Sequence, residues 1–146
     1  MSEERRLVKI LLVEDRDDDI LIIRKAIKEA GIVNELEVVR DGEEALDYLT
    51  RRQDDPVGRP GIILLDLNLP KKNGLEVLKE LKANESLRVI PVVVLTVSKR
   101  DEDVIRSYNL GCNSFVQKPL HFEEFVEAVR TIGLYWGLVN VASPVT

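Results

Sequence analysis

Five short runs of apolar, mostly β-branched residues recur along the chain and limit the folds that it can adopt. Each run is nearly all apolar instead of alternating with polar residues, which is typical of strands that are buried on both faces of a sheet. The runs are Val8–Val13, Leu36–Val39, Ile62–Leu65, Val92–Leu95 and Phe115–Val116. A sheet that is covered on both faces needs helices on both sides, so helical patterns are expected between the runs.

Stretches with helical periodicity do separate the apolar runs. Asp17–Ala30 carries isoleucines on one stripe, and from Phe122 to Trp136 apolar residues recur in steps of three and four. The other stretches expected to be helical are Gly42–Arg52, Gly74–Ala83 and Lys99–Leu110. Strands that alternate with helices pair in parallel through right-handed crossovers. The pattern therefore predicts an α/β fold of the flavodoxin-like type, a doubly wound parallel sheet of five strand–helix units.

Composition and charge exclude several classes of protein. The chain has 146 residues, a formal net charge of -5, one cysteine and one histidine. It therefore lacks the basic surface of a nucleic-acid-binding protein, a disulfide framework and a zinc site of the Cys/His type. Its apolar runs are far shorter than the roughly 18 residues of a membrane span, and its charged start does not look like a signal peptide. We expect one cytoplasmic domain that binds neither membranes nor nucleic acid.

Chemically active side chains follow the apolar runs, where the strands should end. Glu14 and Asp15 follow the first run, Asp66 the third, Thr96 the fourth and Lys118 the fifth. The carboxyl ends of parallel strands meet at one edge of a sheet, so these side chains should converge. Three clustered carboxylates repel each other, and one lysine supplies only one positive charge. Since only oxygen ligands are available, a divalent cation is expected among these side chains, and Mg²⁺ suits such ligands best.

With these residues in place, the sequence resembles the receiver domain of two-component response regulators over nearly its whole length. The elements that match in order are the acidic pair, Asp66, the turn Leu69–Gly74, Thr96 and Lys118-Pro119. The amino-acid sequence of Leu64–Gly74 and the presence of Trp136 near the C-terminus most resemble the small response regulators that are paired with bacterial phytochromes. The resemblance implies a sensor histidine kinase as partner, specifically a phytochrome-type kinase, and a signalling protein that is not an enzyme.

The resemblance also implies how the phosphoryl group would be received. Asp66 would be the phosphoacceptor, taking the group from a kinase phosphohistidine as an acyl phosphate. Asp15, Asp66 and the backbone carbonyl of Asn68 would bind Mg²⁺. Glu14 would reach the metal directly or through water.

The same resemblance implies how the signal would leave the site. Lys118 would pair with one phosphoryl oxygen, and Thr96 would swing in to hydrogen-bond another. Phe115 would then turn inward and alter the face formed by the fourth helix, fifth strand and fifth helix. The peptide bond between Lys118 and Pro119 would be cis.

Other interpretations of these residues stay open. Glu14-Asp15 alone could be a solvated strand end and helix cap, and the run Asp17–Asp19 is better explained as a helix N-terminus, where acids suit the dipole. The chain could also be an interaction module that is never phosphorylated. An aspartyl-nucleophile phosphatase of the haloacid-dehalogenase type is a further alternative, but Asn68 occupies the position of its second, proton-transferring aspartate.

The C-terminal residues suggest a contact with a second copy. We assign residues 1–134 to the receiver domain and 135–146 to an extension. Tyr135, Trp136 and Leu138 continue the apolar pattern beyond the helix that a receiver needs. Because an apolar patch of this kind marks a partner surface, we expect a symmetric homodimer that involves this tail.

Overall fold

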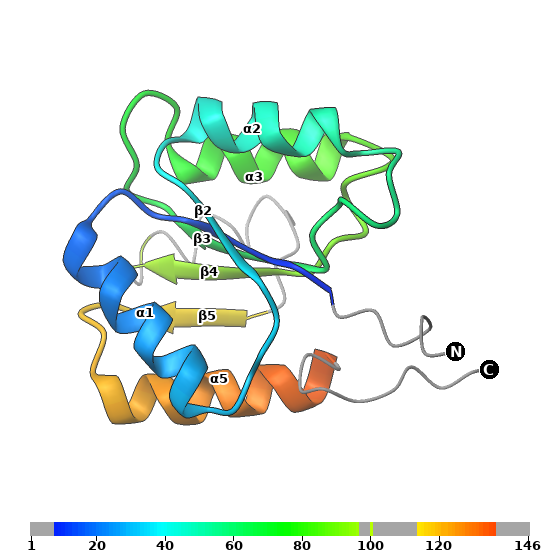
Figure 1. The fold of residues 1–146 in the computed structure, drawn as a ribbon. Helices are drawn as coiled ribbons and strands as arrows, with labels where there is room; N and C mark the ends of the chain where they lie inside the picture. Colours follow the sequence, from blue (N-terminus) through cyan, green and yellow to red (C-terminus); the bar gives the residue numbers. More distant parts are fainter. Residues whose placement is uncertain (1–7, 97–99, 101–113, 137–146) are drawn as a thin grey trace, which may run out of the picture.

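Five parallel strands form a single sheet in the computed structural model, which describes residues 8–96, 100 and 114–136 (Figure 1). The strands are β1 (Ile10–Val13), β2 (Leu36–Val39), β3 (Ile62–Asp66), β4 (Val92–Thr96) and β5 (Ser114–Gln117). Their order across the sheet is β2-β1-β3-β4-β5. This is the flavodoxin-like, doubly wound order, so the predicted fold class is confirmed. The order reverses at β1 and β3, and this is where such sheets place their sites.

Helices cover both faces of the sheet. They are α1 (Asp17–Glu29), α2 (Gly42–Arg51), α3 (Gly74–Ala83) and α5 (Phe122–Trp136). The helices α1 and α5 contact each other on one face, whereas α2 and α3 pack together on the other (Figure 1). The helix expected over Lys99–Leu110 lies outside the described residues, apart from Arg100, which is helical. Among the helices of the described ranges, none is long and apolar enough to cross a membrane.

The observed element boundaries differ from the predicted ones by one or two residues. The first strand begins at Ile10 instead of Val8, because the neighbouring strands β2 and β3 both begin opposite Ile10. Strand β3 extends to Asp66, so this aspartate is the last residue of a strand and does not begin a loop. Helix α5 continues through Trp136, so the first residues of the assigned extension are helical; the division at residue 134 stays a prediction.

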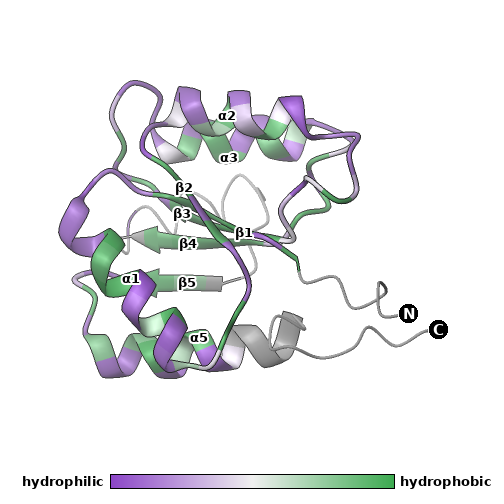
Figure 2. Cartoon of the chain, in the orientation of Figure 1, coloured by the Kyte–Doolittle hydropathy of each residue, from purple (hydrophilic) through white to green (hydrophobic). Residues whose placement is uncertain are grey.

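Alternate residues of each strand point to opposite faces, and the sheet therefore builds two hydrophobic cores. The residues of β1 and β3 on the α2–α3 side are Leu11, Val13, Ile63 and Leu65. Those on the α1–α5 side are Ile10, Leu12, Ile62 and Leu64. Figure 2 shows hydrophobic colour along the strands and a mixture of hydrophilic and hydrophobic residues along the helices. The same alternation determines on which face the polar residues at the strand ends emerge.

Candidate functional site

The alternation of side chains brings two carboxylates and one ammonium group to the same face of the sheet. Glu14 and Asp66 each come two residues after a leucine that packs against α1 and α5. Lys118 comes two residues after Val116, which packs in the same core. The backbone N–H of Glu14 still donates to the carbonyl of Val39, at 3.0 Å, so the extended backbone continues past β1. Period-two geometry thus directs all three side chains toward the N-terminal end of α1.

Lys118 is the centre of this cluster. Its Nζ lies 2.9 Å from Oε1 of Glu14, 2.8 Å from Oδ2 of Asp19 and 3.3 Å from Oδ2 of Asp66. An ammonium group has three N–H bonds, so three carboxylates are enough to accept all of them. The Lys118 side chain is only 7% exposed. The ion pairs are therefore shielded from water and screened much less than surface pairs.

Burial and charge change the acidity of the cluster. Burial raises the pKa of Glu14 to about 7; the hydrogen bond from Lys118 opposes this rise, and the negative charge of Asp66 adds to it. For Lys118, burial lowers the pKa, but the hydrogen bonds to Asp19 and Glu14 and the negative charges of Asp66 and Glu14 together outweigh burial and raise it above its ordinary value. Lys118 therefore stays an ammonium ion at physiological pH.

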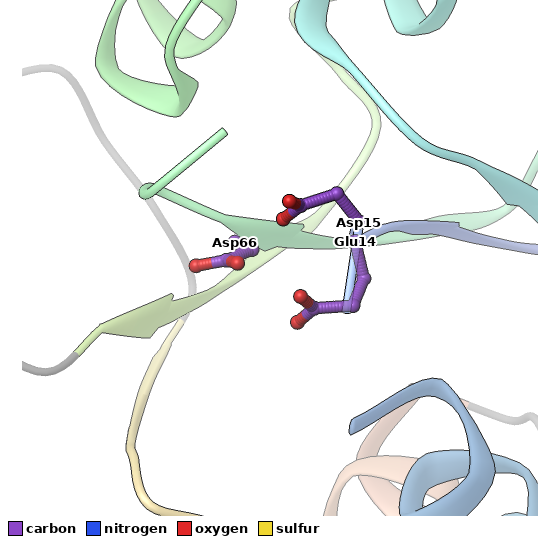
Figure 3. Close-up of side chains that lie close together, drawn as sticks. All are labelled: Glu14, Asp15 and Asp66. Carbon is purple, nitrogen blue, oxygen red and sulfur yellow. The ribbon is translucent and has the colours of Figure 1, made fainter. Parts of the chain in front are cut away.

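A candidate site for a divalent cation lies next to this ion pair. Glu14, Asp15 and Asp66 each offer a carboxylate oxygen, and these oxygens lie within 4.8 Å of one another at the carboxyl ends of β1 and β3 (Figure 3). Oδ1 of Asp15 is buried and has no hydrogen-bond partner among the described residues. A buried, unpaired carboxylate oxygen is costly unless a cation completes its contacts. Oxygen-only donors suit a hard divalent cation, so the residues fit such an ion.

An open cavity of about 340 Å³ gives access to Asp66 and Lys118. Its lining also includes Arg16, Asn68 and Pro119. The backbone N–H of Asn68 donates to Oδ1 of Asp66 at 3.0 Å, while Lys118 donates to Oδ2. Both oxygens of the Asp66 carboxylate are thus held by donors, and this fixes the orientation of the carboxylate at the base of the cavity.

The structure places the remaining predicted residues less completely. Thr96 is the last residue of β4, in register with Gln117 of β5; the position of its side chain lies outside what is described. Phe115, in β5, packs partly buried against the core on the α2–α3 side. The Lys118-Pro119 peptide bond is cis, as the resemblance implied.

Only two of the three residues predicted to form the dimer contact lie within the described part of the chain. Tyr135 and Trp136 lie in the last turn of α5, and Leu138 lies outside the described residues. The dimer that they suggested therefore stays a prediction.

One residue of the site was missed by the sequence-based interpretation. The run Asp17–Asp19 does form the first turn of α1, as predicted, but Asp19 also forms an ion pair with Lys118. A signal for this was present, because Asp19 precedes the buried Ile23 by four residues and so lies on the helix face that meets the sheet. Asp17 and Asp18 are exposed and pair with Arg40 and Arg16 instead of Lys118, although Asp18 also lines the cavity.

The comparison with protein families decides what this arrangement represents. Residues 10–130 match the response regulator receiver domain. The chain belongs to this family. Receiver domains signal through phosphorylation, and those of single-domain response regulators are generally signalling modules without enzymatic activity. A receiver domain implies a histidine kinase as phosphoryl donor, in agreement with the resemblance described above.

Curated relatives cover almost the whole receiver domain. The probable methanogenesis regulatory protein FilR2 of Methanothrix harundinacea is 45% identical over 127 residues, which are 87% of this chain and 82% of FilR2. Response regulator Rcp1 of Synechocystis is 43% identical over 138 residues, which are 93% of this chain and 94% of Rcp1.

Solved structures give the same family with its fold. The bacteriophytochrome response regulator RtBRR has a TM-score of 0.78 at 46% identity and covers 94% of this chain and 85% of its own. The phosphorylated cyanobacterial phytochrome response regulator RcpA has a TM-score of 0.75 at 42% identity, covering 89% and 94% of the two chains. Rcp1 has been solved in an Mn²⁺-bound form. The receiver domain is thus related to phytochrome-associated response regulators.

Proposed function

We propose that Asp66 of this response regulator accepts a phosphoryl group from a sensor histidine kinase. The observation that supports this most directly is the pairing of Asp66 with Lys118 at the base of an accessible cavity. The Asp66 side chain is 2% exposed, and its Oδ2 lies 3.3 Å from the buried ammonium group. A carboxylate oxygen placed in this way can attack an incoming phosphorus atom, while the lysine compensates part of the added negative charge.

The contacts of Asp66 support a role for each neighbouring group. During transfer a bond forms between an Asp66 oxygen and phosphorus, and the bond between phosphorus and the kinase histidine breaks. The N–H of Asn68 holds Oδ1, so the carboxylate does not have to reorient before attack. Lys118, which already contacts Oδ2, lies close enough to pair with a phosphoryl oxygen as the new group arrives.

We propose Mg²⁺ as the cation of the acidic cluster. Asp15, Asp66 and the backbone carbonyl of Asn68 would bind it, with Glu14 reaching it directly or through water. When bound, the cation neutralises charge on the oxygens of the transferring phosphoryl group. The unpaired Oδ1 of Asp15 and the all-oxygen donor set support this assignment. The Mn²⁺-bound form of Rcp1 is consistent with it, since Mn²⁺ and Mg²⁺ prefer similar ligands.

The response to phosphorylation would be a change in packing. A phosphoryl group adds about -1.5 to -2 of charge and three strong acceptor oxygens at the end of β3. Thr96 would hydrogen-bond one of these oxygens, and Phe115 would turn into the space that Thr96 vacates. The partial burial of Phe115 against the core is consistent with a side chain that exchanges between two packing arrangements. The surface beside β5 and α5 would carry the signal.

Phosphorylation can be tested with a small phosphodonor such as acetyl phosphate, with intact mass as the readout. We expect one added phosphoryl group that requires Mg²⁺ and is absent from Asp66→Asn. The same adduct on Asp66→Asn would refute the assignment of the acceptor. If no donor modifies the wild type, the protein is an unphosphorylated interaction module. Rapid turnover of unrelated phosphate esters would instead indicate the phosphatase alternative.

We propose a phytochrome-type kinase as donor and a homodimer as the signalling form. The similarity to RtBRR, RcpA and Rcp1 supports the phytochrome-type kinase. FilR2, a probable methanogenesis regulatory protein of comparable identity, represents the alternative that the donor is a kinase of another pathway. Phosphotransfer from a purified phytochrome kinase should therefore be much faster than from an unrelated histidine kinase; equal rates would refute the pairing.

For the dimer, light scattering should show a loss of mass when Trp136 and Leu138 are both replaced by alanine. An unchanged mass would contradict the tail contact.

A further inference from the structure

Asp19 differs from the other acidic residues at the start of α1. Its side chain is 14% exposed, whereas those of Asp17 and Asp18 are 86% and 66% exposed. Asp18 pairs with Arg16 at the surface, and Asp17 pairs with Arg40. Asp19 instead points inward, and its contact with Lys118, 2.8 Å, is shorter than those made by Glu14 and Asp66.

The three partners of Lys118 come from different parts of the fold. Glu14 directly follows β1 and Asp66 is the last residue of β3. The carboxylates of both residues belong to the group that fits a divalent cation. Asp19 comes from α1, whose first turn lies at the edge of the sheet toward which β4 and β5 point (Figure 1). It is not one of the three residues whose oxygens converge on the candidate cation site in the described structure. Asp19 thus contacts Lys118 from the side of the helix without belonging to the candidate cation ligands itself.

The surroundings of Asp19 restrict its movement. It lies on the same helix face as the buried Ile23 and Ala26, and α1 packs against α5. Nε of Arg16 lies 3.6 Å from the same oxygen that contacts Lys118. In a partly buried position of this kind, an ion pair is screened less by solvent than the surface pairs of Asp17 and Asp18.

We infer that Asp19 is a positioning residue, which holds the ammonium group of Lys118 where it can meet the phosphoryl group on Asp66. This inference rests on the proposed function of Asp66 and Lys118. When Glu14 and Asp66 take up a cation and a phosphoryl group, Asp19 is the partner that keeps its contact with Lys118. The N–H bonds that Glu14 and Asp66 accept in this structure then become available to a phosphoryl oxygen. The competing explanation is that Asp19 only stabilises the N-terminus of α1, as any first-turn acid does.

The neighbouring Asp18 provides a matched control. Asp18→Asn removes the same charge from the same helical turn, but Asp18 contacts Arg16 and not Lys118. Asp19→Ser removes the lysine contact, and Asp19→Asn removes the negative charge but keeps an amide oxygen that can accept from Lys118, so two variants are available should one fold poorly. Circular dichroism before and after thermal unfolding identifies the variants that are native.

The first measurement is the rate of phosphorylation by acetyl phosphate as a function of Mg²⁺ concentration. We expect the maximal rate of the Asp19 variants to fall by about tenfold, since small displacements of a reacting group reduce rates up to about a hundredfold. The Mg²⁺ concentration for half-maximal rate should change no more than in Asp18→Asn. If Asp19 only stabilises the helix, the Asp18 and Asp19 variants should show similarly lowered melting temperatures, and the maximal rate of the folded protein should be unchanged. This result would overturn the inference.

The second measurement does not depend on phosphorylation. Acetic anhydride acetylates free lysine amines, and peptide mass spectrometry gives the extent at Lys118 relative to the exposed Lys71. We expect several-fold more acetylation of Lys118 in the Asp19 variants than in the wild type or in Asp18→Asn. If the wild type is not phosphorylated, the proposed function fails, yet acetylation still decides whether Asp19 holds Lys118. Equal acetylation of Lys118 in all variants would refute the positioning role.

Discussion

Replacing the buried Glu14 by glutamine should stabilise the metal-free protein at pH 8 and leave it unchanged near pH 4. The Glu14 side chain is fully buried, with 0% exposure, and its pKa is raised from 4.5 to about 7. The folded state therefore prefers the protonated carboxyl, whereas the unfolded chain ionises at its ordinary pKa. A raised pKa contributes stability that is fully present below pH 4.5 and is lost as the pH rises through 7. Glutamine resembles the neutral carboxyl and does not titrate.

The expected difference follows from the size of the pKa shift. Each pH unit between 4.5 and about 7 is worth about 1.4 kcal/mol, so the wild type loses about 3 kcal/mol relative to Glu14→Gln by pH 8. Small domains have a total unfolding free energy of about 5–15 kcal/mol, so this loss is readily measured. The two proteins share all other titratable groups, whose contributions largely cancel in the comparison.

Urea unfolding in EDTA at several pH values between 4 and 8 measures this difference. We expect the two unfolding free energies to coincide at pH 4 and to separate progressively up to pH 8, with the variant the more stable. Saturating Mg²⁺ should reverse the order at pH 8, because a cation that binds only the folded state stabilises it, and the wild type binds more strongly. A difference that does not change with pH, or a metal-free wild type that is the more stable protein at pH 8, would refute the burial argument.

Two further predictions concern the proposed metal ligand Asp15 and the packing of the loop before α3. Asp15→Asn should weaken Mg²⁺ binding by about tenfold or more in calorimetry, because it removes the charge of a ligand. The buried Oδ1 of Asp15 has no hydrogen-bond partner among the described residues, so the substitution breaks no other contact of this atom. Unchanged affinity would exclude Asp15 as a ligand. Gly42→Ala should lower the unfolding free energy by about 1–3 kcal/mol in urea, because the new Cβ would overlap the backbone carbonyl of Lys72. A variant as stable as the wild type would show that this loop can move away.

Much of the fold and site followed from local patterns in the sequence. Continuous apolar runs separated by helical periods favour a parallel sheet, because such runs are typical of strands buried on both faces and helices usually form the crossovers that join parallel strands. Parallel strands gather their carboxyl ends at one edge, so Glu14, Asp15, Asp66 and Lys118 could be expected to meet. The observed cluster agrees with this expectation.

What the tertiary structure alone decided depends on distances and burial between distant segments. Lys118 could pair with any of the acids near the start of α1, and the phase of that helix against the sheet selects Asp19 and leaves Asp17 and Asp18 in solvent. The raised pKa of Glu14 likewise depends on how completely α1 and the sheet enclose it, which no local pattern expresses. The residue types at the site were thus determined by the sequence, whereas their partners and their acidity were determined by the packing of α1 against the sheet.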